Sequence, residues 1–380
     1  MNMNAVKFEQ GPIRPPSEAG SLLLRLTRNC PWNRCLFCPV YKDEKFSKRS
    51  IDEIKNDIFA IVKAAEEISA LSNSYGFSGE VNRAVVAKIQ AEHPELFQVA
   101  FWLYQGGENV FLQDGDSLLL PAEQLSEILE MLTTKFPSIK RITSYARSKT
   151  LLKRNLEDLE RLKKAGLNRI HVGLESGNDR VLEFMKKGVT GAEHVEAGQR
   201  VKKAGLSLSE YVVLGLGGEQ WWREHALDTA EVLNQINPDF IRVRTLAVPE
   251  ISPLYDKILE GEFKLLPDDD VIREEKLFIE NLQGIGSEFY SDHILNLLED
   301  VNGKLPEDKS KMLGVISKYQ SLPNAKREKF RLGRRTGYYR TMSDMQSSNL
   351  NDPVENHYRK LQQKGVSVDD YIKELMLRFI

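Results

Sequence analysis

The chain has 380 residues, with 53 Lys and Arg against 55 Asp and Glu, so its formal net charge is −2. This balance excludes a global basic field of the kind that attracts nucleic acid. Hydrophobic residues make up 41% and charged residues 28%, as in ordinary globular proteins. No apolar run approaches the roughly 20 residues of a membrane helix, and the first residues do not form a signal peptide. We expect a cytoplasmic protein without membrane contact.

All three cysteines of the chain, Cys30, Cys35 and Cys38, lie in the stretch NCPWNRCLFC. An odd number of clustered thiols argues against a secreted disulfide scaffold. Three interpretations compete: small core residues, a zinc site completed by a distant histidine, or an iron–sulfur cluster held by thiolates on a short loop. In the last case three thiolates hold three irons of a four-iron cluster, and the fourth iron stays open to another ligand.

From this loop onward, strands and helices alternate along the chain. Residues 21–29 form a short apolar run that predicts a buried strand feeding the cysteine loop. Ser50 and Glu53 form a capping box, which predicts that a helix follows and runs to about residue 71. Further strands are predicted over 109–113, 140–145, 169–175, 208–216 and 239–248, and further helices over 121–136, 151–166, 193–205 and 222–236. Six strands with intervening helices indicate an α/β fold with a parallel sheet.

Two regions fall outside this alternation. Residues 72–108 separate the first helix from the second strand and are expected to be an insertion with a helix over 78–93. After residue 250 the pattern predicts helices over 268–282, 291–301 and 303–320. We therefore divide the chain into an N-terminal extension (1–20), a core (21–250, with the insertion 72–108) and a helical C-terminal region (251–380).

The segment 324–340 carries seven basic residues and one acidic residue, with Phe330, Tyr338 and Tyr339 among them. Aromatic side chains interleaved with basic ones suit contacts with phosphate, carboxylate or RNA. A solvated basic face explains the same composition. Both interpretations remain open from the sequence.

The spacing of Cys30, Cys35 and Cys38 is similar to the three-cysteine signature of radical S-adenosylmethionine (radical SAM) enzymes, with four residues instead of the usual three in the first gap. The stretch GLESGND (173–179) resembles the anaerobic coproporphyrinogen oxidase-like and methylthiotransferase groups of that superfamily. The resemblance covers about residues 20–250. It implies a partial (β/α)6 TIM-like barrel, here with a helical insertion and a mostly α-helical C-terminal extension.

The resemblance also implies a site. The three cysteines would hold a [4Fe–4S] cluster, and Phe37, just before the last cysteine, would flank S-adenosylmethionine (SAM). In the GLESG stretch, Glu175 would be a catalytic and cofactor-binding residue. Weaker cofactor-binding candidates at the ends of later strands are Ser144, Leu214, Gly215 and Gly217.

Many radical SAM enzymes carry GGE after the second strand, where it contacts the amino group of SAM. The literal triplet here, 106–108, precedes the strand 109–113, so we expect it to be only a turn. Chemistry in a parallel barrel lies at the C-terminal ends of the strands. Asp114, Gly115 and Asp116 occupy that end, and we expect them to bind the cofactor.

The function implied by the resemblance is reductive cleavage of SAM, which yields methionine and a 5′-deoxyadenosyl radical that abstracts hydrogen from an unknown substrate. A one-electron donor such as flavodoxin or ferredoxin would be a partner. Two alternatives stay open: a cluster- or haem-carrying relative without turnover, and a zinc-stabilised RNA-binding protein that uses the basic segment.

Overall fold

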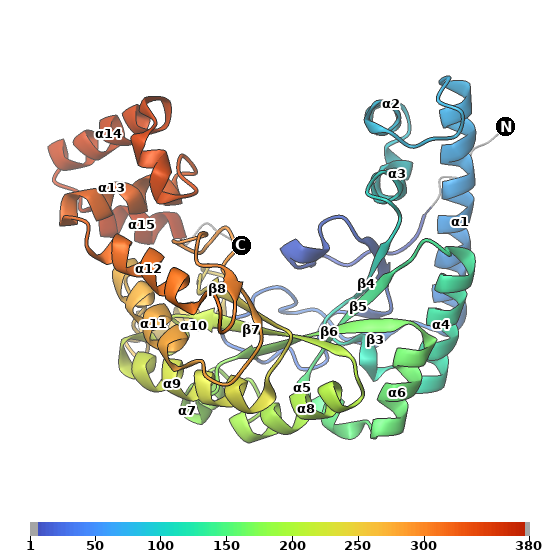
Figure 1. Cartoon of the computed structure of the whole chain (residues 1–380), viewed down its shortest axis with the longest axis horizontal. Helices are drawn as coiled ribbons and strands as arrows, with labels where there is room; N and C mark the ends of the chain where they lie inside the picture. Colours follow the sequence, from blue (N-terminus) through green and yellow to red (C-terminus); the bar gives the residue numbers. More distant parts are fainter. Residues whose placement is uncertain (1–6, 377–380) are drawn as a thin grey trace. The chain divides into compact units, whose positions relative to one another are not determined.

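The computed structural model describes residues 7–376, so the first six residues of the expected N-terminal extension and residues 377–380 lie outside the described residues. The chain forms two compact units (Figure 1). The first unit holds residues up to 31, 43–172 and 200–207, and the second unit holds 32–42, 173–199 and the chain from 208 on. The expected domain boundaries at residues 20 and 250 stay predictions.

The first unit is built on parallel strands. Strand β1 (Leu22–Arg25) pairs with β4 (Asn109–Gln113), β4 with β5 (Arg141–Ala146), and β5 with β6 (Leu167–Glu175). A short antiparallel pair, β2 (Thr27–Arg28) and β3 (Ser47–Lys48), flanks the cysteine loop. The helices are η1 (Pro16–Glu18), α1 (Ile51–Ser74), α2 (Arg83–Glu92), η2 (Pro94–Leu96), α3 (Phe97–Tyr104), η3 (Ser117–Leu119), α4 (Ala122–Lys135), α5 (Ser148–Lys153) and α6 (Leu156–Ala165).

The second unit continues the same alternation. Strand β7 (Ser207–Leu214) pairs in parallel with β8 (Phe240–Thr245), β8 with β9 (Glu288–Tyr290), and β10 (Gly303–Lys304) is antiparallel to β9. Its helices are α7 (Asp179–Phe184), α8 (Gly191–Lys203), α9 (Gly218–Ile236), α10 (Pro253–Leu259), α11 (Asp268–Asn281), α12 (Lys309–Gln320), α13 (Asn324–Arg335), η4 (Met342–Gln346), α14 (Ser348–Gln363) and α15 (Val368–Met376). The strand order, β1-β4-β5-β6-β7-β8-β9-β10, confirms the predicted α/β fold of the partial-barrel type.

Local sequence signals explain where several elements begin and end. The Ser50 hydroxyl accepts the Glu53 backbone N–H at 3.2 Å, and the Glu53 carboxylate accepts the Ser50 N–H at 2.8 Å, which confirms the capping box. Helices α6 and α8 both carry basic residues in their last turn, where they complement the helix dipole. Gly166 (φ 120°) and Gly205 (φ 71°) then take backbone conformations that favour glycine and turn the chain into β6 and β7.

Three sequence predictions about secondary structure were wrong in detail. The single helix over 151–166 is two helices, since the Asn155 side chain accepts the Asp158 N–H and starts α6 anew. The insertion contains α3 as well as a shortened α2. Residues 291–301 form a loop rather than a helix, because Asn296 binds the end of β8. Its Oδ1 accepts the Thr245 N–H at 2.7 Å and its Nδ2 donates to the Val243 carbonyl at 2.8 Å. The leucines of this loop are buried, and their spacing in the sequence resembles that of an amphipathic helix.

The basic segment 324–340 also requires a correction. Arg331, Arg334 and Arg335 of α13 are buried, so they form neither a solvated face nor an open ligand surface. Their ion-pair partners within the second unit are Asp269 and Asp369 for Arg331, Glu299 for Arg334 and Asp268 for Arg335. Phe330 and Tyr339 are fully buried and stack at 6.2 Å between ring centroids. An RNA or anion contact of the remaining exposed residues stays a prediction.

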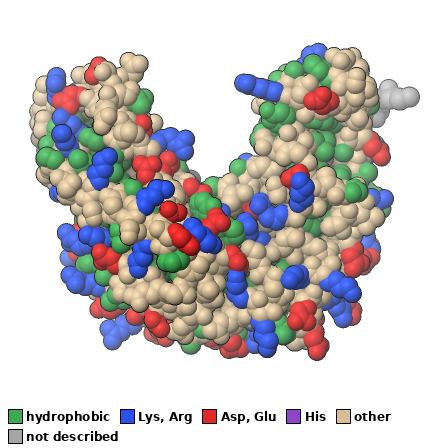
Figure 2. Space-filling model, in the orientation of Figure 1, with side chains coloured by type: hydrophobic (Ala, Val, Ile, Leu, Met, Phe, Trp, Pro, Cys, Tyr) green, Lys and Arg blue, Asp and Glu red, His purple; other side chains and the backbone are tan. Residues whose placement is uncertain are grey.

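Figure 2 shows Lys and Arg side chains interspersed with Asp and Glu on the visible face of each unit, as the small net charge suggests. None of the described helices is long and apolar enough to cross a membrane.

The ion pairs predict that Arg335 and Arg340, although close in sequence, differ strongly in their contribution to the free energy of unfolding. Arg335→Ala leaves the Asp268 carboxylate, whose side chain is only 10% exposed, without its guanidinium and should lower the free energy of unfolding by about 3–5 kcal/mol. Arg340→Ala removes a side chain that is 79% exposed and should change it by less than about 0.5 kcal/mol. Urea denaturation followed by circular dichroism measures both, and equal effects would contradict the structural role of Arg335.

Candidate functional site

The turn before Cys30 is held by a buried carboxylate. Asp114, directly after β4, is fully buried, and its Oδ2 accepts the Arg25 Nε–H at 2.8 Å and the Asn29 backbone N–H at 3.0 Å. A Cβ at Gly115 would stand 3.4 Å from the Cα and Cβ of Cys30, so the backbone after Asp114 packs directly against this cysteine. Asp114 therefore fixes the turn that carries the first thiol.

Protein groups hold both aspartates of the loop after β4. The Asp114 carboxylate accepts from Arg25 and Asn29. Asp116 is also fully buried, and its carboxylate accepts the Thr150 hydroxyl of α5. Burial raises the pKa of Asp116 to about 7 in spite of that hydrogen bond. Asp116 thus joins the loop after β4 to α5, and the expected binding of the cofactor by Asp114, Gly115 and Asp116 stays a prediction.

The following part of the cysteine loop, residues 32–42, is anchored in the second unit. Leu36, between Cys35 and Cys38, is buried; its N–H donates to the Met185 carbonyl at 3.0 Å and its carbonyl accepts the Leu254 N–H at 3.0 Å. These bonds fix the segment that carries the second and third cysteines against the C-terminal end of α7 and the first turn of α10.

A lysine that the sequence-based prediction missed joins this loop to the GLESG stretch. Lys187 Nζ lies 3.0 Å from Oε1 of Glu175 at the end of β6, and 5.8 Å from the ring centroid of Phe37. Glu175 adopts a φ of 65°, an uncommon conformation for a residue other than glycine. The signal that could have identified Lys187 is the basic pair KK that follows α7. The structure thus brings together two predicted site residues, Glu175 and Phe37.

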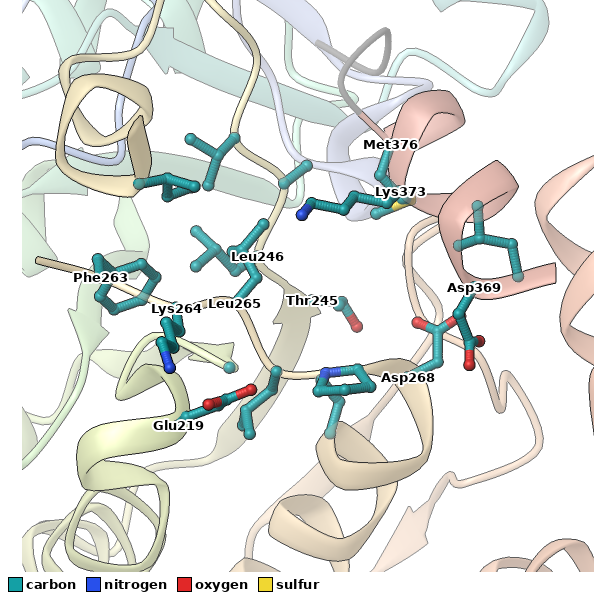
Figure 3. A pocket seen from close by; sticks show the side chains of 18 of the residues that line it. Glu219, Thr245, Leu246, Phe263, Lys264, Leu265, Asp268, Asp369, Lys373 and Met376 are labelled. Atoms are coloured by element: carbon teal, nitrogen blue, oxygen red, sulfur yellow. The ribbon is translucent and has the colours of Figure 1, made fainter. Parts of the chain in front are cut away.

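A pocket of about 490 Å³ opens at the C-terminal ends of β7 and β8 (Figure 3). Leu214 and Gly215, both predicted cofactor contacts, line it, and Lys373 and Met376 of α15 face it. Most of its other lining residues are apolar: Leu246, Ala247, Val248, Ile258, Phe263, Leu265, Leu266, Pro267, Val271 and Ile372. A largely apolar pocket with a few polar groups is typical of small-molecule sites.

Gly217, whose predicted cofactor contact stays a prediction, is required by the packing around it. A Cβ at this position would come within 2.8 Å of the Trp221 carbonyl oxygen and 2.9 Å of the His225 Cβ, so only glycine allows α9 to begin here.

Two further predictions about the site concern strand ends. Ser144 is fully buried on β5, next to Tyr145, whose ring contacts Phe111 and His171 at 5.0 and 5.8 Å between centroids. Because side chains alternate along a strand, Ser144 points to the opposite face of the sheet from these rings. Its expected contact with the cofactor stays a prediction. The literal GGE triplet is a turn before β4, as predicted, with Glu108 paired to the exposed Lys140.

Residues 24–230, more than half of the chain, match the family model of the radical SAM superfamily. The chain belongs to the radical SAM superfamily. Its cofactors are therefore a [4Fe–4S] cluster and SAM.

Individual relatives of this radical SAM protein are distant. It is 24% identical over 174 residues to the uncharacterized protein MJ0486 of Methanocaldococcus jannaschii, which is 46% of this chain and 53% of that one. It is 25% identical over 117 residues to the tRNA uridine(34) acetyltransferase of the same organism, 30% of this chain and 22% of that one. The solved structure of coproporphyrinogen III oxidase from Escherichia coli has a TM-score of 0.47 and 17% identity, and the match covers 69% of this chain and 52% of that chain. The radical SAM chain spans about half of these proteins or less.

The residues present fit both cofactors. The three cysteines are half-buried on an irregular loop, and thiolates are the usual ligands of a [4Fe–4S] cluster. Lys187 and Glu175 offer opposite charges, which suits the charged methionine moiety of SAM. Over the described residues, no three His, Cys, Asp or Glu side chains already stand together as a metal site. That Cys30, Cys35 and Cys38 of this radical SAM protein are the ligands of the cluster therefore rests on their spacing in the sequence and is a proposal.

The buried Asp114 predicts a specific defect in cluster retention. Asp114→Asn removes the charge that holds Arg25 and weakens the acceptor of the Asn29 N–H, so the turn before Cys30 should loosen. We expect a loss of iron per chain after anaerobic reconstitution, measured by a colorimetric iron assay. Asp116→Asn, an equally buried change that leaves this turn intact, is the matched control. Equal iron loss in two folded variants would show that Asp114 has no special relation to Cys30.

Proposed function

We propose that this chain is a radical SAM enzyme that cleaves SAM reductively and uses the resulting 5′-deoxyadenosyl radical to abstract a hydrogen atom from its substrate. The observation that carries the proposal is the contact series Phe37–Lys187–Glu175, which joins the cysteine loop to the carboxyl end of β6. The carboxyl ends of parallel strands are where barrel enzymes place their chemistry.

Cys30, Cys35 and Cys38 would hold the cluster through their thiolates. When bound, the cluster would supply one electron, taken from a donor such as flavodoxin or ferredoxin, for the cleavage of SAM into methionine and a radical that abstracts a hydrogen atom from the substrate. The protein has to bind, orient and shield these reactants.

Particular side chains can bind and orient these reactants. The Lys187 ammonium, paired with Glu175 at 3.0 Å, is a cation that can bind the carboxylate of SAM, and Glu175 is an acceptor for hydroxyl or ammonium hydrogens. The largely apolar pocket at the ends of β7 and β8 suits the adenine ring. Gly115 brings the backbone after Asp114 into van der Waals contact with Cys30.

The metal site is tested by anaerobic reconstitution. Wild-type protein should hold about four irons per chain, and Cys30→Ala, Cys35→Ala and Cys38→Ala should each abolish the cluster. With dithionite and SAM, the wild type should form 5′-deoxyadenosine slowly even without substrate, which chromatography of the quenched mixture detects.

Two outcomes would contradict the proposal. Stoichiometric zinc with no iron uptake would reject the iron–sulfur assignment. A loaded, reduced cluster that gives no adenosyl product, with or without cell extract, would favour a carrier without turnover.

The role of Glu175 is tested separately. Glu175→Gln keeps the size of the side chain but removes the charge that pairs with Lys187, and a small misplacement of a bound reactant can cost about a hundredfold in rate. We expect normal iron content and much slower 5′-deoxyadenosine formation. Glu108→Gln, in the literal GGE turn, is the control and should cleave like the wild type. If Glu175→Gln cleaves as fast as its control, Glu175 does not position the cofactor.

A further inference from the structure

A buried histidine lies behind the GLESG turn. His225 of α9 is 1% exposed, and its two ring nitrogens contact two different strand ends. Nδ1 is 2.8 Å from the hydroxyl of Ser176, the residue after Glu175, and Nε2 is 3.1 Å from the carbonyl oxygen of Val213 on β7. One imidazole ring therefore connects the turn after β6 to the end of β7.

The partners define which nitrogen carries the hydrogen. A carbonyl oxygen only accepts, so Nε2–H donates to Val213 and Nδ1 accepts from the Ser176 hydroxyl. The Ser176 oxygen in turn accepts the Asn178 N–H at 3.0 Å. Burial lowers the pKa of His225 to about 4, in spite of the bond to Val213, so the ring is neutral near pH 7 and keeps this one tautomer.

Helices α9 and α11 supply two further bonds to the same strand ends. The Thr229 hydroxyl of α9 accepts the Gly177 N–H at 2.8 Å. The Glu274 carboxyl of α11 accepts the Gly215 N–H at 2.7 Å. Because Gly215 lines the pocket at the ends of β7 and β8, this network holds two turns. One is the turn after β6, next to Glu175, and the other is the turn after β7 that lines the pocket.

This hydrogen-bond network fixes the conformation of the turn that carries Glu175. Glu175 has a φ of 65°, an uncommon conformation for a residue other than glycine, so its turn depends on external partners for its conformation. Satisfied buried polar networks specify one arrangement of the groups they join. We propose that His225 is a positioning residue for SAM cleavage, because its bond to the Ser176 hydroxyl holds the Glu175 turn, while its bond to Val213 orients the imidazole ring. This inference rests on the proposed function.

Two substitutions separate the two bonds of His225. In His225→Asn the side-chain oxygen can take the place of Nδ1 and accept from Ser176, but the side chain is too short to reach Val213. In His225→Gln the amide can take the place of Nε2 and donate to Val213, while the Ser176 hydroxyl loses its acceptor. His194→Asn, at another histidine of the second unit with 1% exposure, is the control for general destabilisation.

The experiment compares these reconstituted variants in the 5′-deoxyadenosine assay, with kcat and KM for SAM, iron per chain and the urea unfolding midpoint measured for each. We expect His225→Gln to lower kcat at least about tenfold at normal iron content. His225→Asn should recover most of the rate, although it loses a hydrogen bond as well. Ser176→Ala should reproduce His225→Gln, and the two changes together should cost no more than either alone.

Each contrary result has a distinct meaning. If His225→Asn and His225→Gln lose equal activity, or if activity follows the unfolding midpoint in all variants including His194→Asn, His225 is only structural and the inference is overturned. If the variants cleave like the wild type, the inference is overturned while the proposed function stands. A cluster-loaded wild type that neither binds SAM in calorimetry nor cleaves it overturns the proposed function, and the inference with it.

Discussion

Parallel strands end in turns whose backbone N–H and C=O groups have lost their ladder partners, and buried groups of this kind need hydrogen bonds. In this protein buried side chains accept hydrogen bonds from the turns next to the candidate site residues. Asp114 accepts from the turn before Cys30, Ser176 and Thr229 accept from the turn after β6, Glu274 accepts from the turn after β7, and Asn296 accepts from the end of β8. The positions of the cysteine loop, of Glu175 and of the turn at Gly215 that lines the pocket all depend on these bonds.

The C-terminal helices obey a related constraint. Three arginines of α13 bury their charge only because acidic groups from α11, α15 and the loop after β9 meet them. A buried ion pair adds little net stability over apolar packing, but loss of one partner is costly. These pairs therefore favour one arrangement of α11, α13 and α15. That arrangement brings Lys373 and Met376 to the pocket (Figure 3), so α15 of the C-terminal region forms part of the pocket wall.

Membership of the radical SAM superfamily, shown by the match over residues 24–230, gives the cofactors and the general chemistry but not the substrate. The pocket at the ends of β7 and β8 is built from both the matched part of the chain and the part after it. Leu214 and Gly215 come from the matched part, whereas the walls from residues 245–271 and α15 lie beyond it.

The sequence by itself determined the alternation of strands and helices, the capping box at Ser50, the cysteine loop and the placement of the literal GGE triplet at the wrong end of its strand. These features depend on local periodicity, on hydrogen bonds over three residues or on chain order, all of which are written in neighbouring residues. Only the tertiary structure decided that Asp114 and Asp116, two positions apart, bind different partners, that the arginines of α13 are buried, and that Lys187 and His225 belong with Glu175. Each of those facts depends on a contact between residues 12 to about 100 positions apart in the sequence. The chemistry of one side chain does not specify which distant residue it will contact.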